Sequence, residues 1–143
     1  MIVVDVNVVA YFFIEGGKTR LARELMRRDP DWRLPPLWRH EYLNVLATYA
    51  RQGGATLEQA RGLWRRALEL LGPREQSADA EAALAIAISH PVSAYDGQYA
   101  ALAQQLGAVL VTEDRRLLKA FPSIARTMQA LVASREDGPA DGR

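Results

Sequence analysis

Two short apolar runs, each closely followed by an aspartate, set the architecture that this chain can adopt. The first run is Ile2–Val4, which ends at Asp5, and the second is Ala108–Val111, which is soon followed by Asp114. Continuous apolar runs of this length are typical of strands that are buried on both faces of a sheet. We therefore expect a sheet that is covered by helices on both sides.

Helical and extended patterns alternate along the chain, which is typical of an α/β sandwich around a mostly parallel sheet. Helices are expected at Asn7–Ile14, Thr19–Arg28, Leu37–Arg51, Thr56–Leu71, Ser77–Ser89, Ser93–Leu106 and Asp114–Ala120. Shorter strands are expected at Trp32–Leu34, Arg74–Gln76 and Ile124–Thr127, with a final turn or helix at Met128–Ala133. Residues 1–133 are thus predicted to form a single domain, and the polar segment 134–143 is predicted to be disordered.

The composition is that of an ordinary globular protein, and it excludes several classes of protein. The 143 residues are 49% apolar and 24% charged, which suits one domain with a substantial core. No apolar run approaches the roughly 20 residues that cross a bilayer, and no basic segment precedes the first run as in a signal peptide. The absence of Cys excludes disulfides and thiolate metal sites, and a cytoplasmic location is expected. The net charge of +1 predicts no strong overall attraction to nucleic acid.

Four acidic residues are expected to meet at one edge of the sheet. In parallel α/β sheets the carboxyl ends of strands and the amino ends of helices share an edge, which is where such folds bind ligands. Asp5 and Asp114 follow strands, whereas Asp96 and Glu41 lie in the first and second turns of helices. Their mutual repulsion would require a divalent cation, and an all-oxygen set of ligands favours Mg²⁺ or Mn²⁺ over Zn²⁺.

Helix capping is an alternative role for each of the three aspartates. Asp5 and Asp114 each precede a helix, and Asp96 is spaced to complete a capping arrangement with Ser93. Capping does not explain Glu41, which shares a helix face with apolar residues and would need a partner there. The joint placement of the four acids at one edge favours a metal site over four unrelated local roles.

At this point the chain resembles the PIN-domain ribonucleases over roughly residues 1–127. The segments that carry the resemblance are Ile2–Val8 (IVVDVNV), Glu41 with Asn44–Leu46, Ala94–Tyr99 (AYDGQY) and Val109–Leu117 (VLVTEDRRL). The resemblance implies a three-layer α/β/α sandwich with a central parallel sheet of four to five strands. It also implies Mg²⁺ or Mn²⁺ held by Asp5, Asp96 and Asp114, with Glu41 bound directly or through water, and hydrolysis of RNA phosphodiester bonds.

Small prokaryotic members of this family are often VapC-type toxins. The resemblance therefore implies a toxin whose antitoxin partner inserts a segment into the acidic groove, and a homodimer. Two departures are mild: Asn7 stands where many members have Ser or Thr, and Gly97 lies inside a helix. Glycine there costs roughly 1 kcal/mol of helix propensity relative to alanine, and it is expected to permit a close backbone approach.

Several neighbours of the acids are expected to support them. Asn44, one turn after Glu41, is placed to hydrogen-bond it. Asn7 and Thr112 each lie two residues from an acid and are expected to orient a water, a ligand or a phosphate, with turn and cap chemistry as the alternative. His40 and His90 are not expected to be ligands. Phosphates of a bound RNA would be contacted by Arg115 and Arg116, with Lys18 as a further candidate.

Two other functions remain open at this level. An aspartate directly after the first strand also suits a phosphohydrolase with Asp5 as covalent nucleophile. Such enzymes usually have a second aspartate two residues later, where this chain has Asn7, and a well-placed lysine. The third hypothesis is a non-catalytic module that binds RNA or a protein partner and keeps its acids as helix caps.

Overall fold

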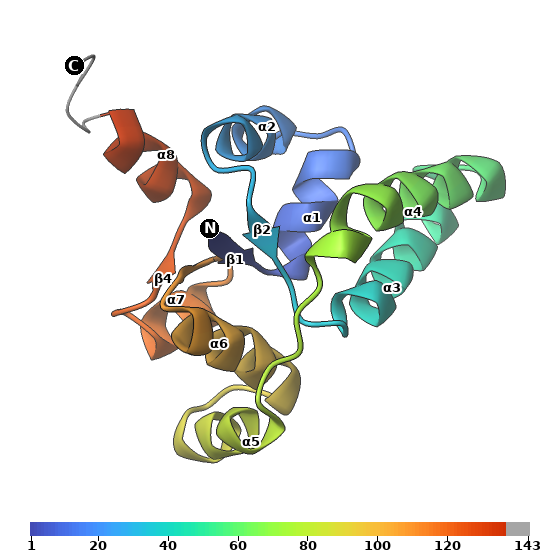
Figure 1. The fold of residues 1–143 in the computed structure, drawn as a ribbon. Coiled ribbons are helices and arrows are strands. Elements are labelled where there is room, and N and C mark those ends of the chain that lie inside the picture. The colour runs from blue at the N-terminus through green and yellow to red at the C-terminus, as the bar shows by residue number, and fades with distance from the viewer. Residues whose placement is uncertain (137–143) are drawn as a thin grey trace.

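The computed structural model describes residues 1–136, which form a parallel sheet between two layers of helices (Figure 1). The strands are β1 (Ile2–Val4), β2 (Trp32–Arg33), β3 (Val109–Val111) and β4 (Ala125–Arg126). Their order is β2-β1-β3-β4, and every pairing is parallel. The α/β/α sandwich with a central sheet of four strands is thus confirmed.

Alternate residues of the central strand β1 pack into two different helical layers. Ile2 and Val4 lie in an apolar cluster with α1 (Val6–Phe13), α2 (Thr19–Arg28), α3 (Trp38–Arg51), α4 (Leu57–Leu71) and α8 (Met128–Glu136). Val3 points the other way, into a cluster with residues of α6 (Ala94–Leu106), next to α5 (Ala80–Ser89) and α7 (Arg115–Ala120). Within residues 1–136 no helix is both long and apolar enough to cross a bilayer.

The strand expected at Arg74–Gln76 is wrong. Residues Gly72–Arg74 form a 3₁₀ helix, with Pro73 favouring the tight turn, and Glu75 makes only an isolated bridge with Leu34. The side chain of Glu75 explains the irregular path: it accepts a hydrogen bond from Trp38 Nε1 at 2.7 Å and pairs with Arg39. These contacts with α3 hold residues 74–76 in a loop beside the sheet.

Two helix boundaries also differ from those expected. α5 begins at Ala80, because Asp79 is its N-cap and accepts hydrogen bonds from the backbone N–H groups of Glu81 and Ala82. α8 continues to Glu136, so that the segment expected to be disordered begins inside a helix. The rest of that segment, residues 137–143, lies outside the described residues.

Gly97 permits a close contact between α5 and α6. A Cβ atom at Gly97 would lie 2.7 Å from the backbone oxygen of Ala83, closer than real Cβ atoms come to such an atom. The backbone approach expected at Gly97 is therefore confirmed. It fixes α6, which carries Asp96, against a neighbouring helix.

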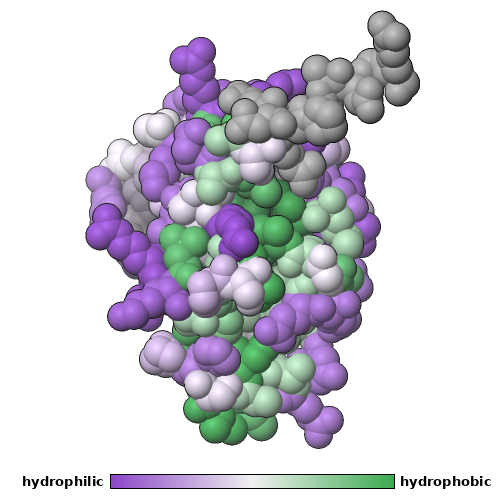
Figure 2. Space-filling view, turned by 90° about the vertical axis from the view of Figure 1, so that its left-hand side faces the viewer, coloured by the Kyte–Doolittle hydropathy of each residue, from purple (hydrophilic) through white to green (hydrophobic). Residues whose placement is uncertain are grey.

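One face of the molecule carries exposed apolar side chains. In Figure 2 hydrophobic residues reach the surface at the lower end of the molecule, the level at which α5 lies in Figure 1. The exposed large apolar residues of α5 are Leu84 and Ile88, which are 57% and 78% exposed. Clusters of this kind are typical of contact surfaces.

Candidate active site

Asp5 lies at the carboxyl end of β1 and is 5% exposed. Its Oδ1 accepts hydrogen bonds from the backbone N–H groups of Asn7 at 2.8 Å and Val8 at 3.3 Å, so it caps α1. Its Oδ2 accepts a hydrogen bond from the hydroxyl of Thr112. Burial raises the pKa of the Asp5 carboxyl, and these hydrogen bonds counteract the rise only in part. Capping therefore uses one oxygen of Asp5 and does not explain why the group is buried.

Thr112 joins two of the acids. β1 and β3 pair with Val4 opposite Val111, which brings Asp5 and Thr112 to the same level at the edge of the sheet. The fully buried hydroxyl of Thr112 donates to Asp5 and accepts a hydrogen bond from the backbone N–H of Asp114 at 3.0 Å. One side chain thus sets the spacing between the ends of the two central strands.

Asp114 and Asp96 share a single arginine. Asp114 caps α7 by accepting a hydrogen bond from the backbone N–H of Arg116 at 2.8 Å. The Nη2 atom of Arg116 lies 3.0 Å from Asp114 Oδ2 and 4.0 Å from Asp96 Oδ2. The hydrogen bond from Arg116 holds the pKa of Asp114 below its ordinary value. Burial raises the pKa of Asp96, with Arg116 opposing that rise.

Glu41 faces the same space from α3. Tyr99, on α6, donates a hydrogen bond from its hydroxyl to Glu41 Oε1 at 2.7 Å. Burial raises the pKa of Glu41, and the negative charges of Asp96 and Asp5 raise it further. These interactions place Glu41 within electrostatic reach of two other acids, although it lies on the opposite helical layer from Asp96.

The four carboxylates surround one edge of the sheet without forming a closed set of ligands. Among residues 1–136, no three acidic or histidine side chains lie close enough, as they stand, to hold a metal ion. Asp114 is turned towards Arg116, and one oxygen of Glu41 is bound to Tyr99. Ligation by all four acids would therefore require side-chain rotation.

The residues present nevertheless fit a hard divalent cation in chemical type. All four candidate donors are carboxylates, which suit Mg²⁺ or Mn²⁺. Burial and neighbouring negative charges raise the pKa values of three of them, Asp5, Glu41 and Asp96. A cation between them would remove this penalty on their ionised forms.

The other expected site residues occupy varied positions. Asn44 is exposed and makes no hydrogen bond with Glu41 in the described chain, so the support expected from Asn44 is wrong, and the donor to Glu41 is Tyr99. Asn7 is exposed and contributes its backbone N–H to Asp5. Arg115 is exposed, and Lys18 pairs with Glu113 at 3.5 Å.

Neither histidine pairs with one of the four acids within residues 1–136. His40 is exposed on α3, and the ring of His90 packs against Phe121 with centroids 4.9 Å apart. That the histidines are not ligands stays a prediction.

The sequence does not indicate that Tyr99 contacts Glu41. It lies three residues after Asp96, a spacing that puts two side chains on the same side of a helix. Its position within an apolar stretch of α6 makes it resemble an ordinary core residue, and only the three-dimensional structure shows that its hydroxyl reaches Glu41.

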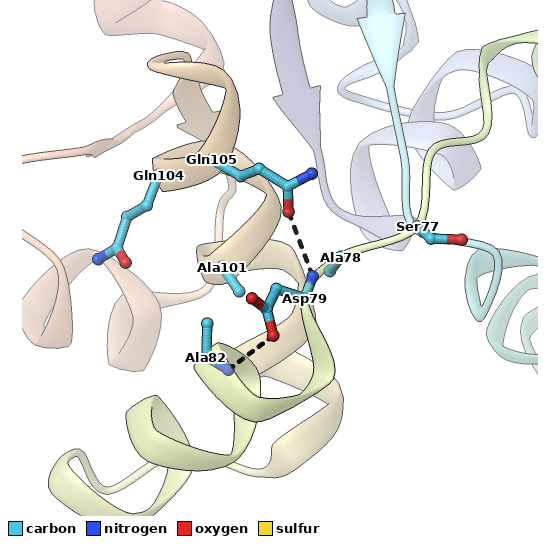
Figure 3. Close-up of a pocket in the computed structure, with 7 residues that line it drawn as sticks. All are labelled: Ser77, Ala78, Asp79, Ala82, Ala101, Gln104 and Gln105. Carbon is cyan, nitrogen blue, oxygen red and sulfur yellow. Dashed lines mark hydrogen bonds between the residues drawn. The ribbon is translucent and has the colours of Figure 1, made fainter.

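A hollow of about 590 Å³ lies elsewhere and offers no comparable chemistry. It is lined by Ser77, Ala78, Asp79, Ala82, Ala101, Gln104 and Gln105 (Figure 3). It lies by the carboxyl end of α6, whereas Asp96 is at the amino end. Asp79 caps α5 there, and its backbone N–H donates to Gln105 Oε1 at 3.2 Å. The acid that lines this hollow, Asp79, is thus already used to cap α5.

Comparisons with known proteins indicate the family to which the chain belongs. The model of the PIN domain family matches residues 2–122. Ribonuclease VapC3 of Pyrobaculum aerophilum is 28% identical over 126 residues, which cover 86% of this chain and 96% of the relative.

Two solved structures show the same fold. PAE2754 from Pyrobaculum aerophilum has a TM-score of 0.74 at 22% identity, covering 92% of this chain and 93% of that one. FitAcB from Neisseria gonorrhoeae has a TM-score of 0.64 at 19% identity, covering 90% and 99%. Since the family model spans most of the chain, this protein belongs to the PIN-domain family.

Proposed function

We propose that the protein is a Mg²⁺- or Mn²⁺-dependent endoribonuclease that hydrolyses RNA phosphodiester bonds. The observation that carries the proposal is the gathering of Asp5, Glu41, Asp96 and Asp114 around one edge of the sheet, three of them with raised pKa values. The similarity to a relative named as a ribonuclease supports RNA as the substrate.

The roles proposed for the four acids are those that the resemblance to PIN-domain ribonucleases implies. Asp5, Asp96 and Asp114 would hold the cation, and Glu41 would bind it directly or through a water. A divalent cation supplies charge neutralisation at the phosphate and lowers the pKa of a bound water, which makes it a nucleophile at neutral pH. Thr112 keeps Asp5 and the backbone of Asp114 at a fixed spacing.

Basic residues near the acids would bind the RNA backbone. Arg116 already lies beside Asp96 and Asp114, and Arg115 precedes it on the exposed start of α7. A guanidinium group presents paired donors that match a phosphate. Lys18 is the third candidate, at the cost of its pairing with Glu113.

The resemblance to VapC-type ribonucleases extends the proposal to partners. We include an antitoxin protein that covers the acidic edge, self-association as a homodimer, and a cytoplasmic location. The exposed apolar side chains of Leu84 and Ile88 on α5 support the existence of a contact surface.

Metal dependence tests the proposal directly. The purified protein should cleave single-stranded RNA with Mn²⁺ or Mg²⁺, lose that activity with EDTA, and regain it when excess Mn²⁺ is added. Equal cleavage with and without chelator would contradict it. A phospho-aspartate trapped at Asp5 under those conditions would instead support the covalent phosphohydrolase.

Mn²⁺ is also expected to stabilise the fold at neutral pH. A ligand present at 100 times its dissociation constant adds about 2.7 kcal/mol to the free energy of unfolding. Protons compete with the cation for carboxylates, so this gain should shrink as the pH falls through the pKa values of the acids. Thermal unfolding with and without Mn²⁺ across a pH series measures the effect. No shift at any pH would favour a non-catalytic module.

A further inference from the structure

Tyr99 connects the apolar core to the acidic edge. Its side chain is 1% exposed and packs with Val3, Leu102 and Leu110 on the side of the sheet that α6 covers. Its hydroxyl donates to Glu41 Oε1, across 58 positions of sequence. A buried hydroxyl requires a partner, and here the partner is a carboxylate of the proposed active site.

We propose that Tyr99 is a positioning residue that aims the Glu41 carboxylate at the cation or its bound water. This inference rests on the proposed ribonuclease function. The hydroxyl holds Oε1, and within residues 1–136 no hydrogen bond reaches Oε2, which remains available to a ligand.

α6 helps to position two of the acids, Asp96 and Glu41. Asp96 lies in the first turn of α6, and Tyr99 follows one turn later. Gly97 locks that same part of the helix against α5, where a Cβ atom would meet the Ala83 backbone at 2.7 Å. A rigid helix therefore sets the position of Asp96 directly and that of Glu41 through the phenol.

The phenol is the donor in this hydrogen bond. A tyrosine hydroxyl carries its proton at neutral pH, whereas an ionised carboxylate can only accept, so the direction of the bond from Tyr99 to Glu41 is fixed.

Replacing Tyr99 by Phe tests this role because it removes one oxygen and keeps the ring. Measured by calorimetry, the Mn²⁺ affinity of Tyr99→Phe should fall about tenfold, as for other groups that orient a metal ligand. The matched control is Tyr42→Phe: Tyr42 is also buried, but its hydroxyl contacts Leu63 O at 3.4 Å, away from the acids. The control should bind Mn²⁺ as the wild type does.

A double-mutant cycle with Glu41→Gln separates positioning from general support of the fold. If Tyr99 acts through Glu41, adding Tyr99→Phe to Glu41→Gln should change the Mn²⁺ affinity by less than about twofold, within the usual error of additivity. A full tenfold loss in that background, or an equal loss in Tyr42→Phe, would overturn the positioning role. Melting temperatures of all variants establish that each one is folded.

The outcome for Tyr99 and the outcome for the proposed function can be told apart. Mn²⁺ binding that Tyr99→Phe leaves unchanged overturns the role of Tyr99 alone. Mn²⁺ binding that depends on Tyr99, without cleavage of RNA by the wild type, supports the positioning role and overturns the ribonuclease.

Discussion

Replacing Asp5 by Asn is expected to reduce RNA cleavage on the order of 10²–10³-fold, comparable to the loss of one preorganised electrostatic group in other enzymes. The substitution removes the charge and keeps the shape. The amide oxygen can still accept the hydrogen bonds from the backbone of Asn7 and Val8, so the cap of α1 survives. Cleavage rates at saturating Mn²⁺ measure the effect.

When no metal is present, the same variant should lose less stability than the wild type as the pH rises, although its amide NH2 cannot accept the hydrogen bond from Thr112. Burial raises the pKa of Asp5 above that of the unfolded chain, so the folded protein binds more protons between the two values. The free energy of unfolding therefore falls as the pH rises through that window, and Asn is spared this loss. The difference in melting temperature between Asp5→Asn and wild type should grow with pH.

Asp79→Asn provides a matched control for Asp5→Asn. Asp79 caps α5 as Asp5 caps α1, but it is exposed and lies away from the acidic edge. The Asp79→Asn variant should cleave RNA at the wild-type rate. Cleavage by Asp5→Asn at the wild-type rate, or an equal loss in Asp79→Asn, would contradict the assignment of Asp5 to the active site.

Replacing Gly97 by Ala is expected to destabilise the protein by about 1–3 kcal/mol, the usual cost of forcing an extra group into a packed interior. The new methyl group would meet the backbone oxygen of Ala83, which cannot rotate away as a side chain could. α5 and α6 must then separate, which also displaces Asp96. Chemical denaturation measures the change in stability.

Replacing Gly62 by Ala should instead increase the free energy of unfolding. Gly62 lies inside α4, and a Cβ atom there would have no neighbour within 4 Å. Alanine is favoured over glycine in a helix by about 1 kcal/mol, so this variant should be more stable than the wild type. Stabilisation of equal size in both variants would show that helix propensity, and not the contact with Ala83, decides the outcome.

Much of the fold could be predicted because its signals are local. Apolar runs mark β1 and β3, and capping residues such as Thr56, Ser93 and Asp114 mark helix starts. In a parallel sheet, the carboxyl ends of strands and the amino ends of helices lie at the same edge, so these local signals also predict that the four acids lie together. The strand predicted at Arg74–Gln76 was wrong because Glu75 is held by Trp38 and Arg39, residues that are distant in sequence.

The candidate site was predictable in location but not in detail. Residue types and helix starts indicate where Asp5, Asp96 and Asp114 lie. They do not indicate that Arg116 pairs with two of these acids, nor that Tyr99 reaches Glu41. Both contacts depend on rotamers and on helix packing, which no short sequence pattern encodes.

The hydrogen bond between Thr112 and Asp5 joins positions 107 residues apart. Translation produces β1 first, yet this strand lies in the middle of the sheet, and Asp5 can bond to Thr112 only after β3 has been made. A ribosome-bound chain that does not yet include residue 114 therefore lacks one of the four acids, Asp114. If the enzyme cuts RNA, its own messenger is exposed to a competent site only after nearly all of the domain has been synthesised.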